Sequence, residues 1–519
     1  MTDTLDSGPV LAADGRPLKA SLNRALRRQK MRSMMLIAPL LIFIMFTFVI
    51  PIGQMLFRSV ENQIVSDVLP TTTQMLHDWD ASTGERPSED VFAALTKDMM
   101  VAVEKKEHTR LGSRLNYETT GISSLFRKTG RRVDDMGEVY TEQFTALDPT
   151  WENPVFWADL VALPDAAAAL PQTLAAYASF SDTIISEDGD DPREEQPWNT
   201  VYLSLYQDLS AASAADLSAL PAEVGVAQAA VGGFETQNLG DAFTKIDKDW
   251  SSVEVWETIH TYSPDFTNGY FLNSIDRQKT ADGSEWRGEQ QQIYLTLFVR
   301  TLIMSMTITI SCILLGYPVA WLLANLPMRT ANLLMILVLL PFWTSLLVRT
   351  SAWKVLLQQQ GVINDIVVWL GLVADDNRLA LINNATGTII AMTHILLPFM
   401  ILPLYSVMKT VPPTYVRAAK SLGATNWTAF WRVYFPQSVP GIGAGSILVF
   451  ILSIGYYITP EIVGGTKGVF ISNRIAYHIS SSLNWGLAAA LGSILLAVVM
   501  LLYWAYDRIV GIDNVKLGG

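Results

Sequence analysis

Residues 301–328 read TLIMSMTITISCILLGYPVAWLLANLPM, a run without Asp, Glu, Lys or Arg. A helix needs about 20 consecutive apolar residues to cross the hydrocarbon core of a bilayer, and this run exceeds that length. Unpaired backbone N–H and C=O groups are costly in lipid, so a spanning segment of this kind must be helical. The run therefore predicts a transmembrane helix, and the chain is expected to be a membrane protein.

Five further stretches are long and apolar enough to cross. The stretch at 33–57 predicts a retained anchor rather than a cleaved signal peptide, because its apolar core is too long and no small-residue cleavage site follows. Together with 301–328 the stretches predict an all-α polytopic membrane protein with six transmembrane helices. Prolines interrupt several of them, which indicates either ordinary kinks or discontinuous helices that line a cavity. The five stretches are 33–57, 330–348, 379–408, 433–460 and 475–506.

The segment between the first two spans has a different composition. Residues 59–292 hold 40 acidic and 16 basic side chains, a net charge of −24, against 9 acidic and 21 basic in the rest, a net of +12. No charge-free stretch in the segment is long enough to cross, and its helical composition and seven tryptophans predict a folded, mainly helical soluble domain. No internal repeat is evident. Such an acidic segment argues against a nucleic-acid partner, which would need clustered Lys and Arg.

The Lys and Arg residues near the spans predict the orientation. With the N-terminus in the cytoplasm, 14 of them lie inside and 7 outside, which fits the positive-inside rule. Both termini are then cytoplasmic, and the acidic segment is extracytoplasmic. The expected organisation is a cytoplasmic tail (1–32), a first transmembrane helix (33–58), an acidic extracytoplasmic insert (59–292), a permease core (293–510) and a cytoplasmic tail (511–519).

Catalytic and metal sites are not predicted. The histidines of the insert are scattered, with no spacing that suggests metal ligation. The acids Asp188, Asp190 and Asp191 lack the alternation and terminal Glu of a calcium loop, so a solvated acidic loop is the simpler interpretation. Cys312 is the single cysteine and is expected to be a packing residue. The role of the insert is left open.

The segment 411–436, between the fourth and fifth predicted spans, reads VPPTYVRAAKSLGATNWTAFWRVYFP. Its pattern predicts two short cytoplasmic helices. Gly423 would end the first in the left-handed conformation, and Thr425 or Asn426 would cap the second. Pro436 is expected to stop the second helix.

This segment resembles the cytoplasmic signature of permease subunits in ABC-type importers, Glu-Ala-Ala, three residues, Gly, nine residues, Ile, one residue, Leu-Pro. The resemblance implies an importer-permease fold and a coupling helix that docks on a separate ATP-binding subunit. A plain loop joining two spans is the alternative. Arg417 departs from the pattern, which usually has glutamate there and an ion pair between the subunits. The implied ATPase-coupling residues are Arg417, Ala418, Ala419, Gly423, Val433 and Pro436.

A second resemblance concerns PFWTSLLVRTSAW at 341–353 and YYITPEIVGG at 456–465, which are similar to the polyamine (spermidine/putrescine) branch of these permeases. It covers roughly 293–510 and leaves the insert unexplained. The implied substrate is a small polar solute such as a polyamine, with opines and amino-acid-like solutes as alternatives. A cation needs acids or aromatic faces along its pathway, and Glu461 could equally be a helix cap. The substrate-pathway candidates are Trp343, Asp365, Tyr456, Tyr457 and Glu461.

The chain contains no Gly-x-x-x-x-Gly-Lys-Ser/Thr loop, so it is expected to bind no cofactor and to use ATP in trans rather than act as an enzyme. The resemblance implies three protein partners in the inner membrane and outside it: an ATP-binding subunit, a second permease subunit and an extracytoplasmic solute-binding protein. Membrane lipids surround the spans. A receptor with an extracytoplasmic sensor is the rival from another class, but only 13 residues follow Tyr506, too few for an output domain. A secondary transporter would need more ionisable residues inside the membrane.

Overall fold

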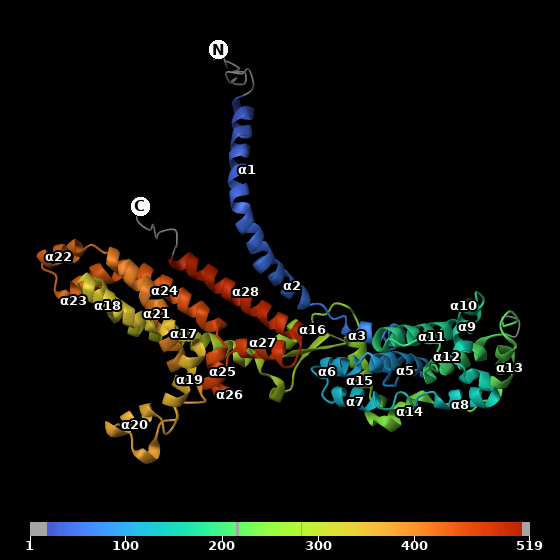
Figure 1. The fold of residues 1–519 in the computed structure, drawn as a ribbon. Helices are drawn as coiled ribbons and strands as arrows, with labels where there is room; N and C mark the ends of the chain where they lie inside the picture. Colours follow the sequence, from blue (N-terminus) through green and yellow to red (C-terminus); the bar gives the residue numbers. More distant parts are fainter. Residues whose placement is uncertain (1–17, 214–216, 282, 511–519) are drawn as a thin grey trace, which may run out of the picture.

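The computed structural model describes residues 18–213, 217–281 and 283–510, which are mostly helical. The predicted tail at 511–519 and the first half of the tail at 1–32 lie outside the described residues. Figure 1 shows a bundle of long helices on the left and a helical domain on the right, and α16 (Gly269–Ser274) lies where they meet. The prediction of a helical membrane protein is confirmed.

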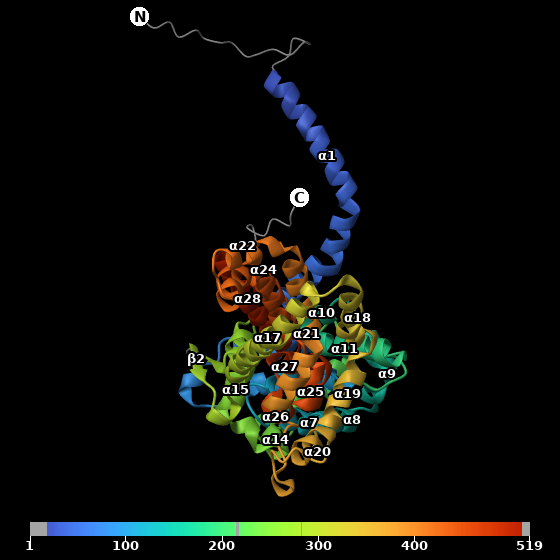
Figure 2. The same cartoon turned by 90° about the vertical axis from the view of Figure 1, so that its left-hand side faces the viewer.

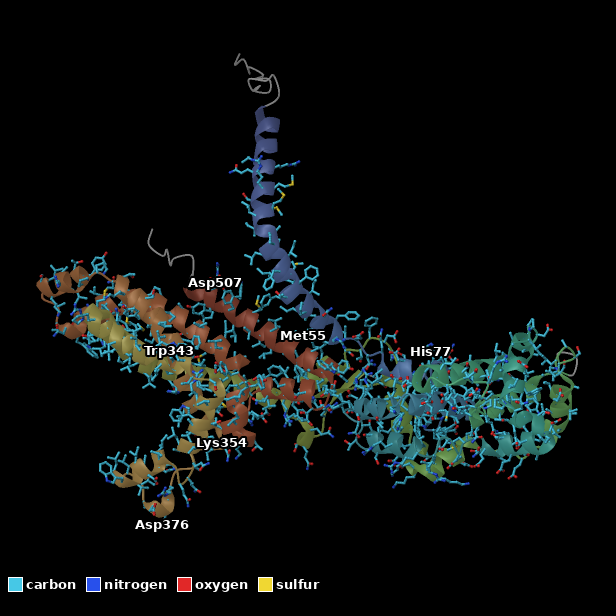
Figure 3. All side chains as sticks on the ribbon, in the orientation of Figure 1. Met55, His77, Trp343, Lys354, Asp376 and Asp507 are labelled. Atoms are coloured by element: carbon cyan, nitrogen blue, oxygen red, sulfur yellow. The ribbon has the colours of Figure 1, made fainter. Side chains whose placement is uncertain are left out.

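The first predicted span is one continuous helical stretch built from α1 (Leu18–Ile44), a π-turn and α2 (Ile50–Arg58). Its apolar part is long enough to cross a membrane, yet none of that part is buried within this chain. Figures 1 and 2 show α1 leaving the rest of the molecule, whereas Met55 of α2 lies beside α28 (Trp485–Val510) in Figure 3. A single chain therefore leaves the apolar surface of its first span uncovered.

Three further helices and α28 form the bundle. The longest is α17 (Tyr294–Asn325), which packs along α21 (Ala385–Thr410), and α24 (Phe435–Gly455) packs against both. Cys312 is fully buried at their contact, as expected of a packing residue. Figure 2 shows the bundle from the left-hand side of Figure 1. In the described part of the chain, five helices are long and apolar enough to cross, or six if one bent pair counts as a single span.

The span predicted at 330–348 falls on this bent pair. Helix α18 (Met328–Leu339) ends in a 3-10 turn that contains Pro341, and α19 (Leu346–Leu356) begins after it at an angle of 94°. Ser345 fixes the new start, because its Oγ accepts the N–H of Val348 at 3.1 Å. Of the two alternatives that the prolines indicated, ordinary kinks or discontinuous helices, the structure has a discontinuous helix at this proline. Helix α20 (Val362–Trp369) then lies in a projecting segment that carries Asp376 near its tip (Figures 1 and 3).

Two other spans begin later than predicted. Helix α21 begins at Ala385 because Asn384 Oδ1 accepts the N–H of Gly387 at 3.0 Å. The run predicted at 475–506 falls on two helices, since α27 (Ile471–Ser480) ends before a turn in which Leu483 has a φ of +53°. The fifth span ends at Gly455 and is followed by α25 (Ile458–Val463) and α26 (Gly465–Gly468).

Between α2 and α17 the insert folds around a core that includes four fully buried tryptophans, Trp151, Trp157, Trp250 and Trp256. A two-stranded antiparallel hairpin, β1 (Arg277–Thr280) and β2 (Gly283–Trp286), follows α16. The helices before α16 are α3 (Ile64–Val68), α4 (Pro70–Leu76), α5 (Glu89–Glu104), α6 (His108–Leu115), α7 (Ile122–Thr129), α8 (Glu138–Leu147), α9 (Pro154–Val161), α10 (Ala166–Ala169), α11 (Pro171–Thr183), α12 (Asn199–Ala211), α13 (Ala222–Ala230), α14 (Leu239–Ile246) and α15 (Val253–Thr261).

The insert contains an internal repeat, although none was predicted from the sequence. FTALDPTWENPVFW at 144–157 and FTKIDKDWSSVEVW at 243–256 share Phe, Thr, Asp and two Trp at the same positions. In each copy the indole N–H of the second Trp donates to the carbonyl of the first at 2.9 Å. The shared Asp lies three residues before the first Trp and has nearly the same backbone angles in both copies. Asp148 has φ −152° and ψ 125°, and Asp247 has φ −153° and ψ 126°. The shared residues and the matching contacts together identify the repeat.

A second matched pair extends the repeat. Asp98 of α5 accepts the backbone N–H and the hydroxyl of Thr72, both at 2.7 Å. Asp208 of α12 does the same for Thr173, again both at 2.7 Å. Each Thr stands in the first turn of its helix, in the sequence Leu-Pro-x-Thr. One half of the insert is therefore α8–α13, and the other joins α3–α7 to α14 and α15, so the repeat is circularly permuted.

The two ends of the insert meet at the bundle. Asn62 N–H donates to the carbonyl of Asp265, and Thr267 N–H donates to that of Val60, both at 2.8 Å. Nearby, the carboxylate of Asp276 accepts the first N–H groups of α17, including that of Tyr294 at 2.9 Å. The insert is thus attached through a short antiparallel bridge and through the cap of a membrane helix.

Candidate functional site

The segment predicted to couple to an ATPase folds as two helices joined by a turn. Helix α22 (Pro413–Ser421) ends at Gly423, which has a φ of +88°, a conformation that glycine adopts without strain. Thr425 caps α23 (Asn426–Ala429), since its Oγ1 accepts the N–H of Thr428 at 3.2 Å. The short helices and the turn between them agree with the pattern read from the sequence.

Pro436 does not stop the second helix. The chain runs from α23 through a π-turn at Phe430–Tyr434 directly into α24, so 426–455 is one continuous helical stretch. Pro436 is the second residue of α24 and follows the π-turn almost directly. The π-turn resets the hydrogen-bond register just before it, which explains why the expected break is absent.

The outer face of this segment is exposed and partly apolar. Leu422 is 89% exposed and Trp427 is 72% exposed, although both are large apolar side chains. Arg417 is exposed, and in the described part of the chain no ion pair or hydrogen bond is recorded for it. The inner face is anchored by Phe430, whose ring packs edge-on to Tyr317 of α17 at 6.2 Å. Large exposed apolar side chains beside an unpaired cation are typical of a protein-docking surface.

The position of α22 complements this surface. Figure 1 shows α22 and α23 at one end of the bundle and the insert at the other. The long axes of α21, α24 and α28 run between these two ends. A ligand that crossed between the insert and α22 would therefore travel the length of the bundle.

Three of the five substrate-pathway candidates lie together. Asn473 Nδ2 donates to the carbonyl of Tyr457 at 2.9 Å and to Oε2 of Glu461 at 2.6 Å. Ser472 Oγ donates to the carbonyl of Tyr456 at 2.8 Å. Glu461 is also in the first turn of α25, where its charge is favourable for the helix dipole. The geometry is compatible with both a capping and a pathway role.

The other two candidates lie elsewhere. Trp343 stands at the bend between α18 and α19 and is 73% exposed (Figure 3). Asp365 lies in the projecting segment with α20, where its Oδ1 pairs with Arg378 at 2.7 Å. No contact is recorded between either residue and Tyr456, Tyr457 or Glu461 within the described residues, so the five do not form one cluster.

A cluster of polar side chains in the bundle was not predicted from the sequence. Trp353 of α19 donates its indole N–H to Nδ1 of His394 on α21 at 3.0 Å. Arg349, one turn before Trp353, has a buried Nε without a partner in the described residues. Thr350 and Thr459 bond to each other at 3.1 Å in the same region. The sequence offered one signal, because His394 stands inside the span predicted at 379–408, whereas Arg349 falls just after the span predicted at 330–348.

A bundle of five or six apolar helices with an exposed helix-turn-helix between two of them is the architecture of an ABC importer permease subunit, an inner-membrane component. The chain belongs to the family of binding-protein-dependent transport system inner membrane components, whose model matches residues 298–510. The insert lies outside this match. The family consists of transporter subunits and not of catalytic enzymes.

Two bacterial permease proteins that are similar in sequence support the same membership. The spermidine/putrescine transport system permease protein PotB of Salmonella typhimurium is 34% identical over 220 residues, which cover 42% of this chain and 76% of that protein. The inner membrane ABC transporter permease protein YdcU of Escherichia coli is 32% identical over 227 residues, which cover 41% of this chain and 71% of that protein. A crystal structure of a bacterial alginate ABC transporter with a pentasaccharide-bound periplasmic protein matches at 17% identity and a TM-score of 0.36, covering 45% of this chain and 82% of the other.

Proposed function

We propose that this permease subunit imports a polyamine such as spermidine or putrescine. The observation that carries the proposal is the 34% identity to PotB, a spermidine/putrescine transport system permease protein. The exposed carboxylate of Glu461 and the exposed ring of Tyr457 support it, since both are groups that attract a cation. The solute would reach the bundle from a solute-binding protein and pass between this chain and a second permease subunit.

The energy would come from a separate ATP-binding subunit that docks on α22. The exposed side chains of Leu422 and Trp427 support this role, because an apolar surface of this kind needs a partner. The exposed alanine at 418 permits close approach by another surface. Arg417 would face an acidic residue of the ATP-binding subunit. This pair would reverse the usual one, in which the permease carries the glutamate and the ATP-binding subunit carries the cation.

In this arrangement α22 is cytoplasmic, and the insert is extracytoplasmic. Two observations support the orientation: the excess of Lys and Arg on the side of α22, and the separation of α22 from the insert by the length of the bundle (Figure 1). Both termini would then be cytoplasmic. A bound cofactor is not required of this chain.

A second candidate substrate is an amino-acid-derived solute, such as an opine. It is favoured by Arg349, a half-buried cation near His394 whose Nε is buried, because this charge would repel a polyamine and attract a carboxylate. This alternative keeps the same coupling mechanism and changes only the pathway.

Reconstitution tests the proposal. The chain would be placed in proteoliposomes with its ATP-binding subunit, second permease and binding protein, and uptake of labelled spermidine would be measured with and without ATP. We expect ATP-dependent uptake that Ala418→Trp reduces at least tenfold. Ala229→Trp, a matched change of an exposed alanine on α13 of the insert, should leave uptake unchanged. Uptake at the same rate with and without ATP would refute the coupling to an ATP-binding subunit. ATP-dependent uptake of an opine but not of spermidine would refute the polyamine assignment.

A further inference from the structure

A cavity of about 900 Å³ lies in the insert, between helices of its two repeated halves. Helices α4 and α5 of one half and α11 and α12 of the other line it. Volumes of about 300–1,000 Å³ are usual for small-molecule sites. Residues at equivalent positions of the repeat meet at this boundary, since Lys97 and Gln207 directly precede Asp98 and Asp208.

Lys97 is the chemically distinctive residue of the cavity. Its Nζ donates to Oε1 of Gln207 at 2.9 Å and to Oε1 of Gln172 at 3.1 Å. An ammonium group has three N–H donors, so one is unused. No salt bridge to Lys97 is found in the described residues, because the neighbouring acids, Asp98 and Asp208, are turned toward the threonines that they cap.

Lys97 is half-buried, and removing an ammonium group even partly from water is unfavourable without a counter-charge. Desolvation lowers the pKa of Lys97 to about 8, and Asp208 and Asp98 oppose the change only in part. The amine is therefore mostly protonated at neutral pH. A ligand carboxylate at the free N–H would supply the missing counter-charge.

Other residues that line the cavity are suited to a positively charged group of a ligand. Asp67 and Asp90 line the cavity as exposed carboxylates, so they face its open side. Lys105 is also exposed there and is the other cation among the lining residues. Trp198 and Tyr206 form part of the wall and give a ligand an apolar surface to pack on. The cavity thus offers a cation inside and carboxylates toward solvent.

We propose that this cavity binds a small zwitterion of the amino-acid class, with its carboxylate on Lys97 and its amino group toward Asp67 and Asp90. A simple dianion would be repelled by the two carboxylates, and a diamine would be repelled by Lys97. The site lies in the insert, so it is separate from the membrane pathway and independent of which solute is transported.

Three four-carbon compounds of matched length test the charge pattern: 4-aminobutyrate, putrescine and succinate. Their binding to the full chain in lipid nanodiscs would be measured by calorimetry, with the change in tryptophan fluorescence that is lost in Trp198→Phe as a second readout. We expect saturable binding of 4-aminobutyrate and binding at least tenfold weaker for the other two. Lys97→Met should weaken the binding of 4-aminobutyrate at least tenfold, whereas Lys245→Met, at an exposed position of α14, should not change it.

A second variant guards against loss of folding. Gln207→Glu places a carboxylate beside Lys97 and should abolish binding while the thermal midpoint stays near that of the unmodified chain. Absence of saturable binding by 4-aminobutyrate, tighter binding of putrescine or succinate, or unchanged binding in both variants would overturn the proposal. Transport by the reconstituted complex does not enter this measurement, so the two proposals can fail separately.

Discussion

Nη1 of Arg114 lies 2.8 Å from Oε1 of Glu118, and both side chains are almost completely buried. Arg287 donates to the other carboxylate oxygen of Glu118 at 2.8 Å, and Arg114 Nε donates to the hydroxyl of Tyr270 at 2.9 Å. Tyr270 is packed directly on Gly486 of α28, where an added Cβ would lie 2.4 Å from its ring. This chain of contacts connects the insert to the membrane bundle.

The first prediction concerns Glu118. Replacing it in Glu118→Gln leaves two buried guanidinium groups without a counter-charge, and loss of one partner of a buried pair costs about 3–5 kcal/mol. We expect a loss of that order in the free energy of unfolding, measured by denaturant titration with tryptophan fluorescence. Asp159→Asn is the control, because its ion pair with Arg193 is exposed and should contribute at most about 1 kcal/mol. Equal losses in the two variants would contradict the prediction.

The second prediction concerns pH and His478 in α27, which lies outside the candidate spans. Burial, aided by the charge of Arg474, lowers the pKa of His478 to about 4 from 6.5. Its ring nitrogens contact Tyr294 Oη at 3.0 Å and Ser482 Oγ at 2.8 Å, and its ring packs on those of Tyr117 and Tyr294. The unfolded chain binds the extra proton between pH 6.5 and 4, so stability is complete above pH 6.5 and falls below it.

The expected loss between pH 7 and pH 4 is up to ~3 kcal/mol, from the difference between the two pKa values. Thermal midpoints measured across this range would reveal it. His478→Gln should flatten the dependence, since glutamine does not titrate. A variant with the same slope as the unmodified chain would assign the pH dependence to other groups.

The third prediction uses the repeat. Asp98→Ala and Asp208→Ala each leave the backbone N–H of a threonine in the first turn of a helix without its acceptor, a loss of about 1–3 kcal/mol. We expect the two losses to agree within about 1 kcal/mol, as measured by denaturant unfolding. Asp190→Ala, at an exposed site without such a contact in the described residues, should change stability by less than about 0.5 kcal/mol. A large asymmetry between the two halves would count against their equivalence.

The fourth prediction separates the two candidate substrates. If the solute is a polyamine, Arg349→Gln removes a repelling charge and should leave the KM for spermidine unchanged or lower. If the solute carries a carboxylate, the same change removes a charge-assisted hydrogen bond of about 1.5–3 kcal/mol and raises the KM at least tenfold. Lys354→Gln, an exposed cation on the same helix (Figure 3), is the control. A rise in the KM for spermidine would contradict the polyamine proposal.

The membrane helices could be predicted well because lipid imposes one requirement on all of them. Residues 301–325 lie in α17, whereas the ends of other spans were misplaced and the runs at 330–348 and 475–506 each fall on two helices. Those ends depend on single side chains, such as the cap from Asn384, which a count of apolar residues does not register. The bend after Pro341 is of the same kind: the proline was seen, but its effect depends on the cap from Ser345.

The site was predicted less evenly. The turn at Gly423 was predictable because a left-handed residue after a helix has a local signature. The contact between Trp353 and His394 joins residues 41 positions apart and has no local signature. The repeat escaped for a related reason, since one of its halves is assembled from two segments separated by the other.

The closeness of the two ends of the insert, Val60–Asn62 and Asp265–Thr267, has an evolutionary consequence. Partners in an antiparallel bridge have Cα atoms only about 5 Å apart, so a single short turn can connect α2 to α16. The whole domain can accordingly be gained or lost in one recombination event, without any change in the reach of the flanking helices. The permuted order of the two halves is consistent with such an event. If a tandem repeat is joined end to end and cut at another point, the two new chain ends lie next to each other.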